Sequence, residues 1–247
     1  MAGESISTFL IYTPFGNTAN KSIVTITGVV SDTEWFNNSY EREGQGCGTI
    51  IGESGGKLWI LTEKKTIKDA AKIKVTFVND AVAEAKLVRY DGNTGLAALT
   101  VDLEDLEDST RNAITVMKTA GLNTIHKGSI VIALGSPLGT NYSILTGTIT
   151  ATNNEISTPD NNYSVYTTDI VASENGSGVL INMDGEFVGV VMQSYSAASA
   201  NTPFGISYFC AICWVTVEMC TPKYGTSLSA NNRSITGISS DISTAVC

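Results

Sequence analysis

The stretch SENGSGVLIN, residues 173–182, decides how the rest of the chain is interpreted. It places Ser177 between two glycines, directly before an apolar run, which is a typical setting for a nucleophilic serine. A serine hydroxyl is a weak nucleophile until a neighbouring base, usually a histidine oriented by a carboxylate, takes its proton. The chain contains one histidine, His126. If His126 cannot reach Ser177, another group must act as the base or the hydroxyl stays inactive.

Short apolar segments on both sides of this stretch predict an all-β fold. They are rich in β-branched residues and are separated by Gly, Asn, Asp and Ser, which is the spacing of a barrel or a sandwich. No long pattern with the helical period of 3.6 residues is present. The segments are residues 22–30, 48–53, 57–62, 72–78, 83–90, 96–101, 129–135, 143–152, 163–171, 177–182 and 186–194.

Composition and charge narrow the classes of partner. A chain of 247 residues with 43% hydrophobic content can bury a full core, as one large β domain or two smaller ones. With 24 acidic against 15 basic residues it has no broad basic surface, which argues against nucleic acid. No window approaches 18 consecutive apolar residues, so we expect no membrane contact within this chain.

The cysteines do not indicate a metal site or a disulfide scaffold. Cys210, Cys213 and Cys220 lie in YFCAICWVTVEMC, where the first pair has CxxC spacing. The surrounding residues favour a strand, on which Cys210 and Cys213 point to opposite faces. No second CxxC or histidine pair completes a four-ligand site. We expect buried, reduced thiols, no metal and no cofactor.

Two other motifs have structural interpretations. The glycines of GQGCG, residues 44–48, open a strand rather than a helix, so we expect a tight barrel turn instead of a nucleotide site. The acidic stretch 102–109 lacks the glycine turn and alternating oxygen ligands of a calcium loop. It is interpreted as a solvated connector between two halves.

Four stretches, taken in order, resemble the protease domain of the HtrA (Deg) family. They are GQGCGTIIGESGGKLWILTEKKTI (44–67), AEAKLVRYDGNTGLAALTVD (83–102), IHKGSIVIALGSPLGTNYSILTGTITAT (125–152) and TTDIVASENGSGVLINMDGEFVGVV (167–191). The resemblance implies two six-stranded antiparallel β-barrels of the trypsin and chymotrypsin type, with few short helices.

The implied domain organisation has four parts. An N-terminal segment covers 1–21, the first barrel 22–107, the second barrel 108–220, and a tail rich in Ser, Thr and Asn 221–247. The family also implies a bacterial protein, extracytoplasmic if a signal or anchor once preceded the chain.

Carried over residue by residue, the resemblance puts Lys65 at the position of the catalytic histidine, Gly95 at that of the aspartate and Ser177 at that of the nucleophile. Two of the three triad members are therefore replaced. His126 precedes the first strand of the second barrel, in a turn that the fold places away from the cleft. The serine endopeptidase fold is expected to lack peptidase activity.

The resemblance also places the oxyanion loop at Asn175, Gly176 and Ser177. The family has a glycine two residues before the serine, where its N–H points at the developing oxyanion, and this chain has Asn175 there. After Ser177 the chain is one residue shorter than the family pattern before the run VLIN.

The substrate pocket is implied at Val171, Gln193, Ser194 and Tyr195, with residues 194–205 as a further wall and Phe204 as an anchor in it. The absence of a counter-charge at Val171 favours small apolar guests. An extended peptide or an unfolded protein segment is the expected partner.

A homo-oligomer is a further expectation, because HtrA proteins trimerise through an N-terminal segment bearing aromatic residues. Phe9, Tyr12 and Phe15 lie near that place, and capping of the first barrel is the other interpretation of these residues.

Three functions remain open at this point. The first is an inactive protease homologue that binds peptides. The second is an active endopeptidase with a Ser177/Lys65 dyad, in which a lowered pKa would let Lys65 act as the base. Against the dyad, Glu63, Lys64 and Lys68 predict a wet and charged environment for Lys65. The third is a structural or sensory domain of a larger protein.

Overall fold

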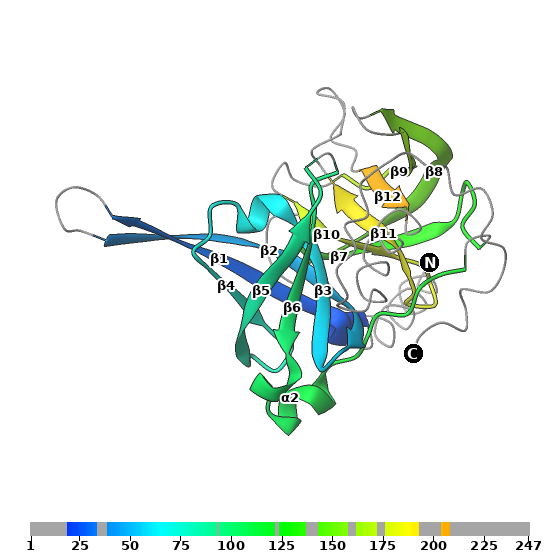
Figure 1. Ribbon diagram of the computed structural model, residues 1–247. Helices are drawn as coiled ribbons and strands as arrows, with labels where there is room; N and C mark the ends of the chain where they lie inside the picture. Colours follow the sequence, from blue (N-terminus) through cyan, green and yellow to red (C-terminus); the bar gives the residue numbers. More distant parts are fainter. Residues whose placement is uncertain are drawn as a thin grey trace, which may run out of the picture.

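Among the residues described in the computed structural model, twelve antiparallel strands form two closed six-stranded barrels (Figure 1). The structure describes residues 19–33, 39–92, 94–121, 124–136, 143–157, 162–171, 176–192 and 204–207. The predicted all-β fold of two barrels is confirmed. In these residues no helix has the length and apolar character needed to cross a membrane.

The first barrel has the strand order β1-β2-β3-β6-β5-β4. Its strands are β1 (Ile23–Thr33), β2 (Ser39–Ser54), β3 (Lys57–Glu63), β4 (Lys72–Thr76), β5 (Val82–Tyr90) and β6 (Leu96–Asp102). Short helices accompany it: η1 (Asn20–Ser22), η2 (Lys64–Ile67), η3 (Leu103–Asp105) and α2 (Asp108–Ala113). The acidic stretch 102–109 thus contains η3 and the beginning of α2.

The second barrel has the order β10-β11-β12-β9-β8-β7. Its strands are β7 (Ile130–Ser136), β8 (Ser143–Ser157), β9 (Asn162–Thr168), β10 (Ser177–Ile181), β11 (Phe187–Met192) and β12 (Phe204–Ser207). The sequence interpretation placed Phe204 in a loop, and this was wrong. Phe204 begins β12, which pairs with both β11 and β9 and so closes the barrel.

The glycines of GQGCG lie inside β2 and not at a turn, which corrects the sequence interpretation. They let helix η2 approach the sheet closely. A Cβ at Gly46 would lie 2.3 Å from Thr66 Oγ1, and one at Gly28 of β1 would lie 2.6 Å from the Thr66 carbonyl oxygen. Only residues without side chains admit η2 at this distance. The position of η2 on the barrel therefore follows from these glycines.

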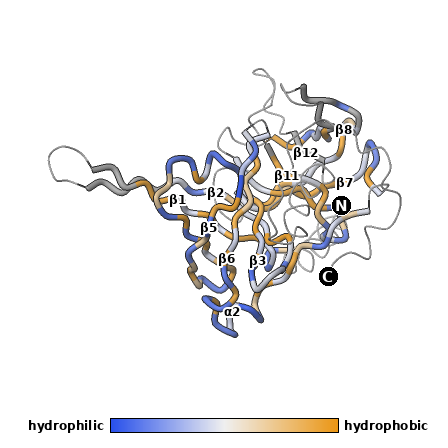
Figure 2. Tube along the Cα trace, viewed as in Figure 1, coloured by the Kyte–Doolittle hydropathy of each residue, from blue (hydrophilic) through white to orange (hydrophobic). Residues whose placement is uncertain are grey.

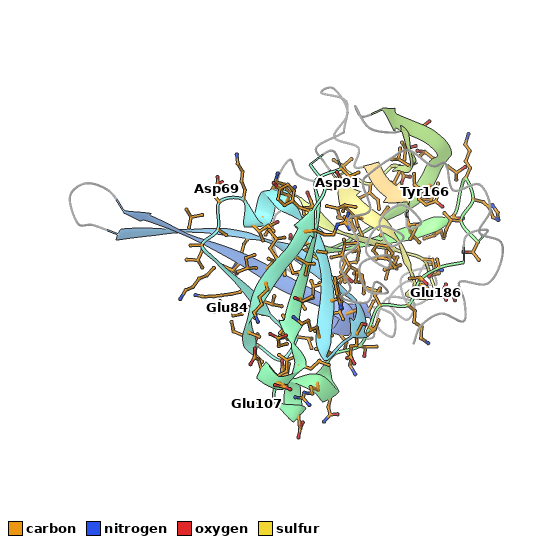
Figure 3. The ribbon with its side chains drawn as sticks, viewed as in Figure 1. Asp69, Glu84, Asp91, Glu107, Tyr166 and Glu186 are labelled. Carbon is orange, nitrogen blue, oxygen red and sulfur yellow. The ribbon has the colours of Figure 1, made fainter. Side chains whose placement is uncertain are left out.

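The described residues form three apolar core clusters, and Figure 2 shows apolar residues along the strands of both barrels. One fills the first barrel, one fills the second, and the third lies between them. The third combines side chains such as Trp59 and Leu61 of the first barrel with Leu134 and Phe187 of the second. Exposed carboxylates such as Glu84 and Glu107 lie on the outer side of the first barrel (Figure 3).

Residues 114–121, which continue the connector from α2 toward β7, are held by backbone hydrogen bonds to both barrels. Met117 donates its N–H to the Ile50 carbonyl of β2, and Phe187 of β11 donates its N–H to the Lys118 carbonyl. Met117 is also part of the cluster between the barrels. The two barrels are thus fixed against each other by apolar packing and by the connector backbone.

Gly135 tests the contact between the barrels. Its φ is +120°, and a Cβ there would lie 2.5 Å from Cys47 Sγ and 3.0 Å from Gly178 Cα. We expect Gly135→Ala to lower the free energy of unfolding by about 2–4 kcal/mol, because both the backbone and the packing oppose a side chain. Denaturant unfolding measures this. Gly92→Ala, at an open position, is the control, and an equal effect of the two variants would contradict the packing argument.

Candidate functional site

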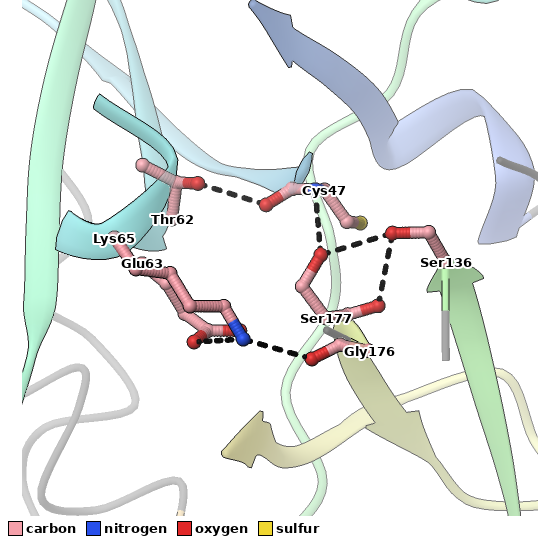
Figure 4. Close-up of polar contacts among 7 residues, drawn as sticks. All are labelled: Cys47, Thr62, Glu63, Lys65, Ser136, Gly176 and Ser177. Atoms are coloured by element: carbon pink, nitrogen blue, oxygen red, sulfur yellow. Dashed lines mark hydrogen bonds and ion pairs between the residues drawn. The ribbon is translucent and has the colours of Figure 1, made fainter. Parts of the chain in front are cut away.

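Lys65 of the first barrel reaches the beginning of β10 in the second barrel. Its Nζ donates to the Gly176 carbonyl oxygen at 3.0 Å and pairs with Glu63 Oε2 at 3.0 Å (Figure 4). The Lys65 side chain is 38% exposed, so its ammonium group lies at the margin of the contact between the barrels. The packing of η2 on the glycines of β1 and β2 fixes this position.

Glu63 is buried, with only 3% of its side chain exposed. The sequence interpretation, which gave Lys65 a wet environment, was wrong on this side. Burial raises the pKa of Glu63 to about 7, and the nearby Lys65 opposes the rise. Among the described residues, Glu63 Oε1 has no hydrogen-bond partner. Glu63 ends a strand in which six consecutive residues are buried, and this run is the signal from which its burial could have been predicted.

Gly95 lies beside the segment that carries Lys65. Its carbonyl oxygen accepts the Lys64 N–H at 2.7 Å, and its own N–H donates to the Asp91 carbonyl at 3.0 Å. Its φ is +74°. The structure thus brings position 95 next to positions 64 and 65, and position 95 presents backbone alone. It contributes no carboxylate to orient a base.

Ser177 is 1% exposed and begins β10. Its Oγ accepts the Cys47 N–H at 2.9 Å and forms a hydrogen bond with Ser136 Oγ at 3.0 Å (Figure 4). Lys65 is not among the partners of this hydroxyl within the part of the chain that the structure describes. Sequence reasoning missed Cys47 and Ser136, which come from β2 and β7.

A small cavity of about 10 Å³ lies between β2, β3 and β10, next to Glu63. It has room for one water molecule at most and not for a substrate side chain. Cys47 also lines it. Burial, reinforced by the Glu63 carboxylate, raises the pKa of the Cys47 thiol to about 12. Because the thiolate is the reactive form, Cys47 does not replace the serine as a nucleophile at neutral pH.

His126 is exposed and lies in the turn before β7. Its carbonyl accepts the Ser129 N–H, so the turn ends where β7 begins. Ser136, which contacts Ser177, is the last residue of β7. A strand of this length spans about 20 Å, so His126 cannot reach Ser177.

The other predicted site residues are only partly described. Val171, expected at the pocket floor, is 63% exposed. The predicted site and structural residues outside the described part of the chain are Asn175, Gln193, Ser194 and Tyr195, together with Cys210, Cys213, Cys220, Phe9, Tyr12 and Phe15. Within the described ranges, no group of three or more His, Cys, Asp or Glu side chains could hold a metal ion.

Comparison with known proteins follows the same stretches. Residues 46–190 match the sequence model of the family described as trypsin-like peptidase domain. A probable periplasmic serine endoprotease DegP-like of Marinomonas sp. is 33% identical over 158 residues, which cover 63% of this chain and 31% of the relative. A serine protease Do-like HtrA of Lactobacillus helveticus is 31% identical over 173 residues, covering 67% and 40%.

A putative serine protease HhoB of Synechocystis sp. is 29% identical over 153 residues, covering 60% of this chain and 34% of the relative. The chain thus spans about a third of the length of these curated relatives.

The buried carboxyl predicts a pH dependence of stability. The pKa of Glu63 is raised from 4.5 to about 7, so the folded protein holds this proton more tightly than the unfolded chain does. The contribution of the protonated Glu63 carboxyl to the free energy of unfolding is complete below about pH 4.5 and is lost as the pH rises to about 7. We expect the stability of Glu63→Gln relative to the parent to rise by about 2–3 kcal/mol across this window. Denaturant unfolding at several pH values measures it, with Glu84→Gln, at an exposed position of β5, as control. A difference independent of pH would refute the assignment.

Proposed function

Since the chain belongs to the family of trypsin-like peptidase domains and has an HtrA-like trypsin fold, we propose that it is a member without peptidase activity. In this proposal it binds extended peptides or unfolded protein segments where active members hold their substrates. Loss of peptide cleavage and retention of peptide binding are two separate properties, and each is tested by its own experiment.

The observation that carries the loss of chemistry is the engagement of Lys65. A general base must accept a proton, and Lys65 acts as a donor in both of its contacts, to Glu63 Oε2 and to the Gly176 carbonyl. A nitrogen that donates hydrogen bonds to these two acceptors is not placed to take the proton of the Ser177 hydroxyl. Position 95 adds no carboxylate.

The Ser177/Lys65 dyad is less well supported. A dyad needs the lysine nitrogen within hydrogen-bond distance of the serine hydroxyl. Lys65 instead contacts the carbonyl of the preceding residue, and the Ser177 hydroxyl is engaged by Cys47 and Ser136. Both residues would have to exchange their partners before the dyad could form.

Two observations support peptide binding. The relatives are named as serine proteases, a class that acts on polypeptides, and the chain shares about 30% identity with them over 158 and 173 residues. Val171, at the position that the family resemblance assigns to the pocket floor, is an apolar side chain 63% exposed. An exposed apolar side chain at such a place suits a small apolar side chain of a bound peptide.

The absence of activity is tested with an active-site probe. We expect no labelling of the parent by a fluorophosphonate and no cleavage of unfolded casein from pH 7 to about pH 10, because no base contacts the Ser177 hydroxyl among the described residues. Lys65→Met and Ser177→Ala are measured in parallel. Labelling of the parent that rises with pH and disappears in both variants would establish the dyad and refute the proposal.

Peptide binding is tested by fluorescence anisotropy with labelled, unfolded casein. We expect Val171→Asp to weaken binding about tenfold or more, since a charge replaces the apolar contact. Val82→Asp is the matched control, because Val82 is equally apolar and 60% exposed but lies on β5 of the first barrel. Equal loss in the two variants, or binding by neither variant nor parent, would contradict the proposed site.

A further inference from the structure

Ser177 lies inside the sheet of the second barrel and not on a loop that faces solvent. It pairs with Ser136 of β7 as the first residue of β10, and it is 1% exposed. A nucleophilic serine must present its oxygen to the substrate and have a base within hydrogen-bond reach. Ser177 is almost fully buried, and none of the described partners of its hydroxyl is a base.

The hydroxyl of Ser177 instead forms hydrogen bonds that connect strands of the two barrels. Pairing of β2 with β3 begins at Gly48, so the amide of Cys47, one residue earlier, has no strand partner on that side. Ser177 Oγ accepts this N–H at 2.9 Å, and it also forms a hydrogen bond with Ser136 Oγ. A buried backbone N–H left without a partner is costly. The hydroxyl therefore joins β10 and β7 of one barrel to β2 of the other.

The residue that meets Lys65 is Gly176. Its carbonyl oxygen accepts the Lys65 ammonium at 3.0 Å. Placing the nucleophile at Gly176 also explains why the segment after Ser177 is shorter than in the family. The chain is one residue shorter than the family pattern between Ser177 and the run VLIN, and counting from Gly176 restores that spacing.

The register of β10 cannot slide to bring Ser177 into the place of Gly176. Gly178 lies opposite Gly135 of β7, and a Cβ at Gly178 would lie 2.2 Å from the Leu134 carbonyl oxygen. A slide by one residue would put Val179 in the place of Gly178, and its side chain would collide with that backbone. A slide would also turn every side chain of β10 to the other face of the sheet.

We infer that Gly176 occupies the position of the nucleophile in this chain, and that the Ser177 hydroxyl is a structural link between the two barrels. This inference rests on the proposed function in so far as both deny Ser177 a role in peptide cleavage. It adds that all three triad positions, Lys65, Gly95 and Gly176, have lost their catalytic side chains.

The thermal stability of Ser177→Ala tests the structural role. Loss of the acceptor leaves the Cys47 N–H buried without a partner, and we expect the Tm to fall by about 3–10 °C. Ser54→Ala is the control, because the Ser54 hydroxyl has no hydrogen-bond partner in the described part of the chain. Removal of a nucleophile that serves only catalysis leaves stability unchanged or raises it. An unchanged or higher Tm for Ser177→Ala would therefore overturn the inference.

A double-mutant cycle with Ser136→Ala sharpens this result. The two hydroxyls share one hydrogen bond, so the fall in Tm of Ser177→Ala/Ser136→Ala should be clearly different from the sum of the single effects. Simple additivity would contradict the shared hydrogen bond.

Restoring the catalytic groups tests the position of the nucleophile. We compare Lys65→His/Gly95→Asp with Lys65→His/Gly95→Asp/Gly176→Ser, and map the fluorophosphonate label by mass spectrometry. We expect labelling at position 176 of the triple variant, at least tenfold above the double variant. A label on Ser177 in either variant would overturn the inference. Absence of a label at position 176 of the triple variant would contradict the assignment of Gly176 to the position of the nucleophile.

The inference and the proposed function can fail separately. Loss of peptide binding with the expected fall in Tm would refute the proposed binding and leave the inference standing. A label on Ser177 in the parent protein would refute both.

Discussion

The close contact of β2 in the first barrel with β7 and β10 in the second is the constraint on which the rest of the site depends. It requires glycine at position 135, where the side chain of Cys47 leaves no room for a Cβ. The pairing of β10 with β7 requires glycine at position 178, where the Leu134 carbonyl leaves none. The same contact brings the Cys47 amide to the Ser177 hydroxyl. Packing of an apolar cluster holds the barrels together, but the glycines decide how near their strands can come. The close approach of the strand backbones therefore sets the geometry of the site, and the side-chain contacts follow from it.

Electrostatics at the site follow from a carboxyl group that is almost fully buried. An ionised carboxylate away from water is unfavourable unless it is paired, and Lys65 supplies the pairing charge from the solvent side. The lysine is thereby fixed in a structural role, with its nitrogen turned to Glu63 and to the Gly176 carbonyl. In a triad the residue at this place must gain and lose a proton in each cycle. Here, among the described residues, Lys65 contacts Glu63 and the Gly176 carbonyl and not the Ser177 hydroxyl.

The sequence predicts the two barrels well, because short β-branched segments and four family-like stretches agree in order and spacing. The family resemblance assigns Lys65 and Gly95 to two triad positions, and the Lys64–Gly95 hydrogen bond brings the segments that carry them together. The sequence does not predict the surroundings of Ser177. The surroundings of Ser177 depend on the register in which β10 pairs with β7, to within one residue. That register is set by the close approach of Gly178 to the Leu134 carbonyl, which lies far away in the sequence. Strand β12 was missed because four residues with a central glycine carry little local strand preference.

The hydrogen bond between Cys47 and Ser177 joins residues 130 positions apart. Contacts of such separation require a large loop to close, whereas the hairpins within each barrel need only short turns. We therefore expect the hairpins to form early in folding and the junction of the barrels to form late. During synthesis, the first barrel would be complete well before β10 leaves the ribosome, and its face toward the second barrel, with Trp59 and Leu61, would stay open to water until then. We therefore expect chaperones that bind exposed apolar surface to bind this face of the first barrel while the chain is only partly synthesised.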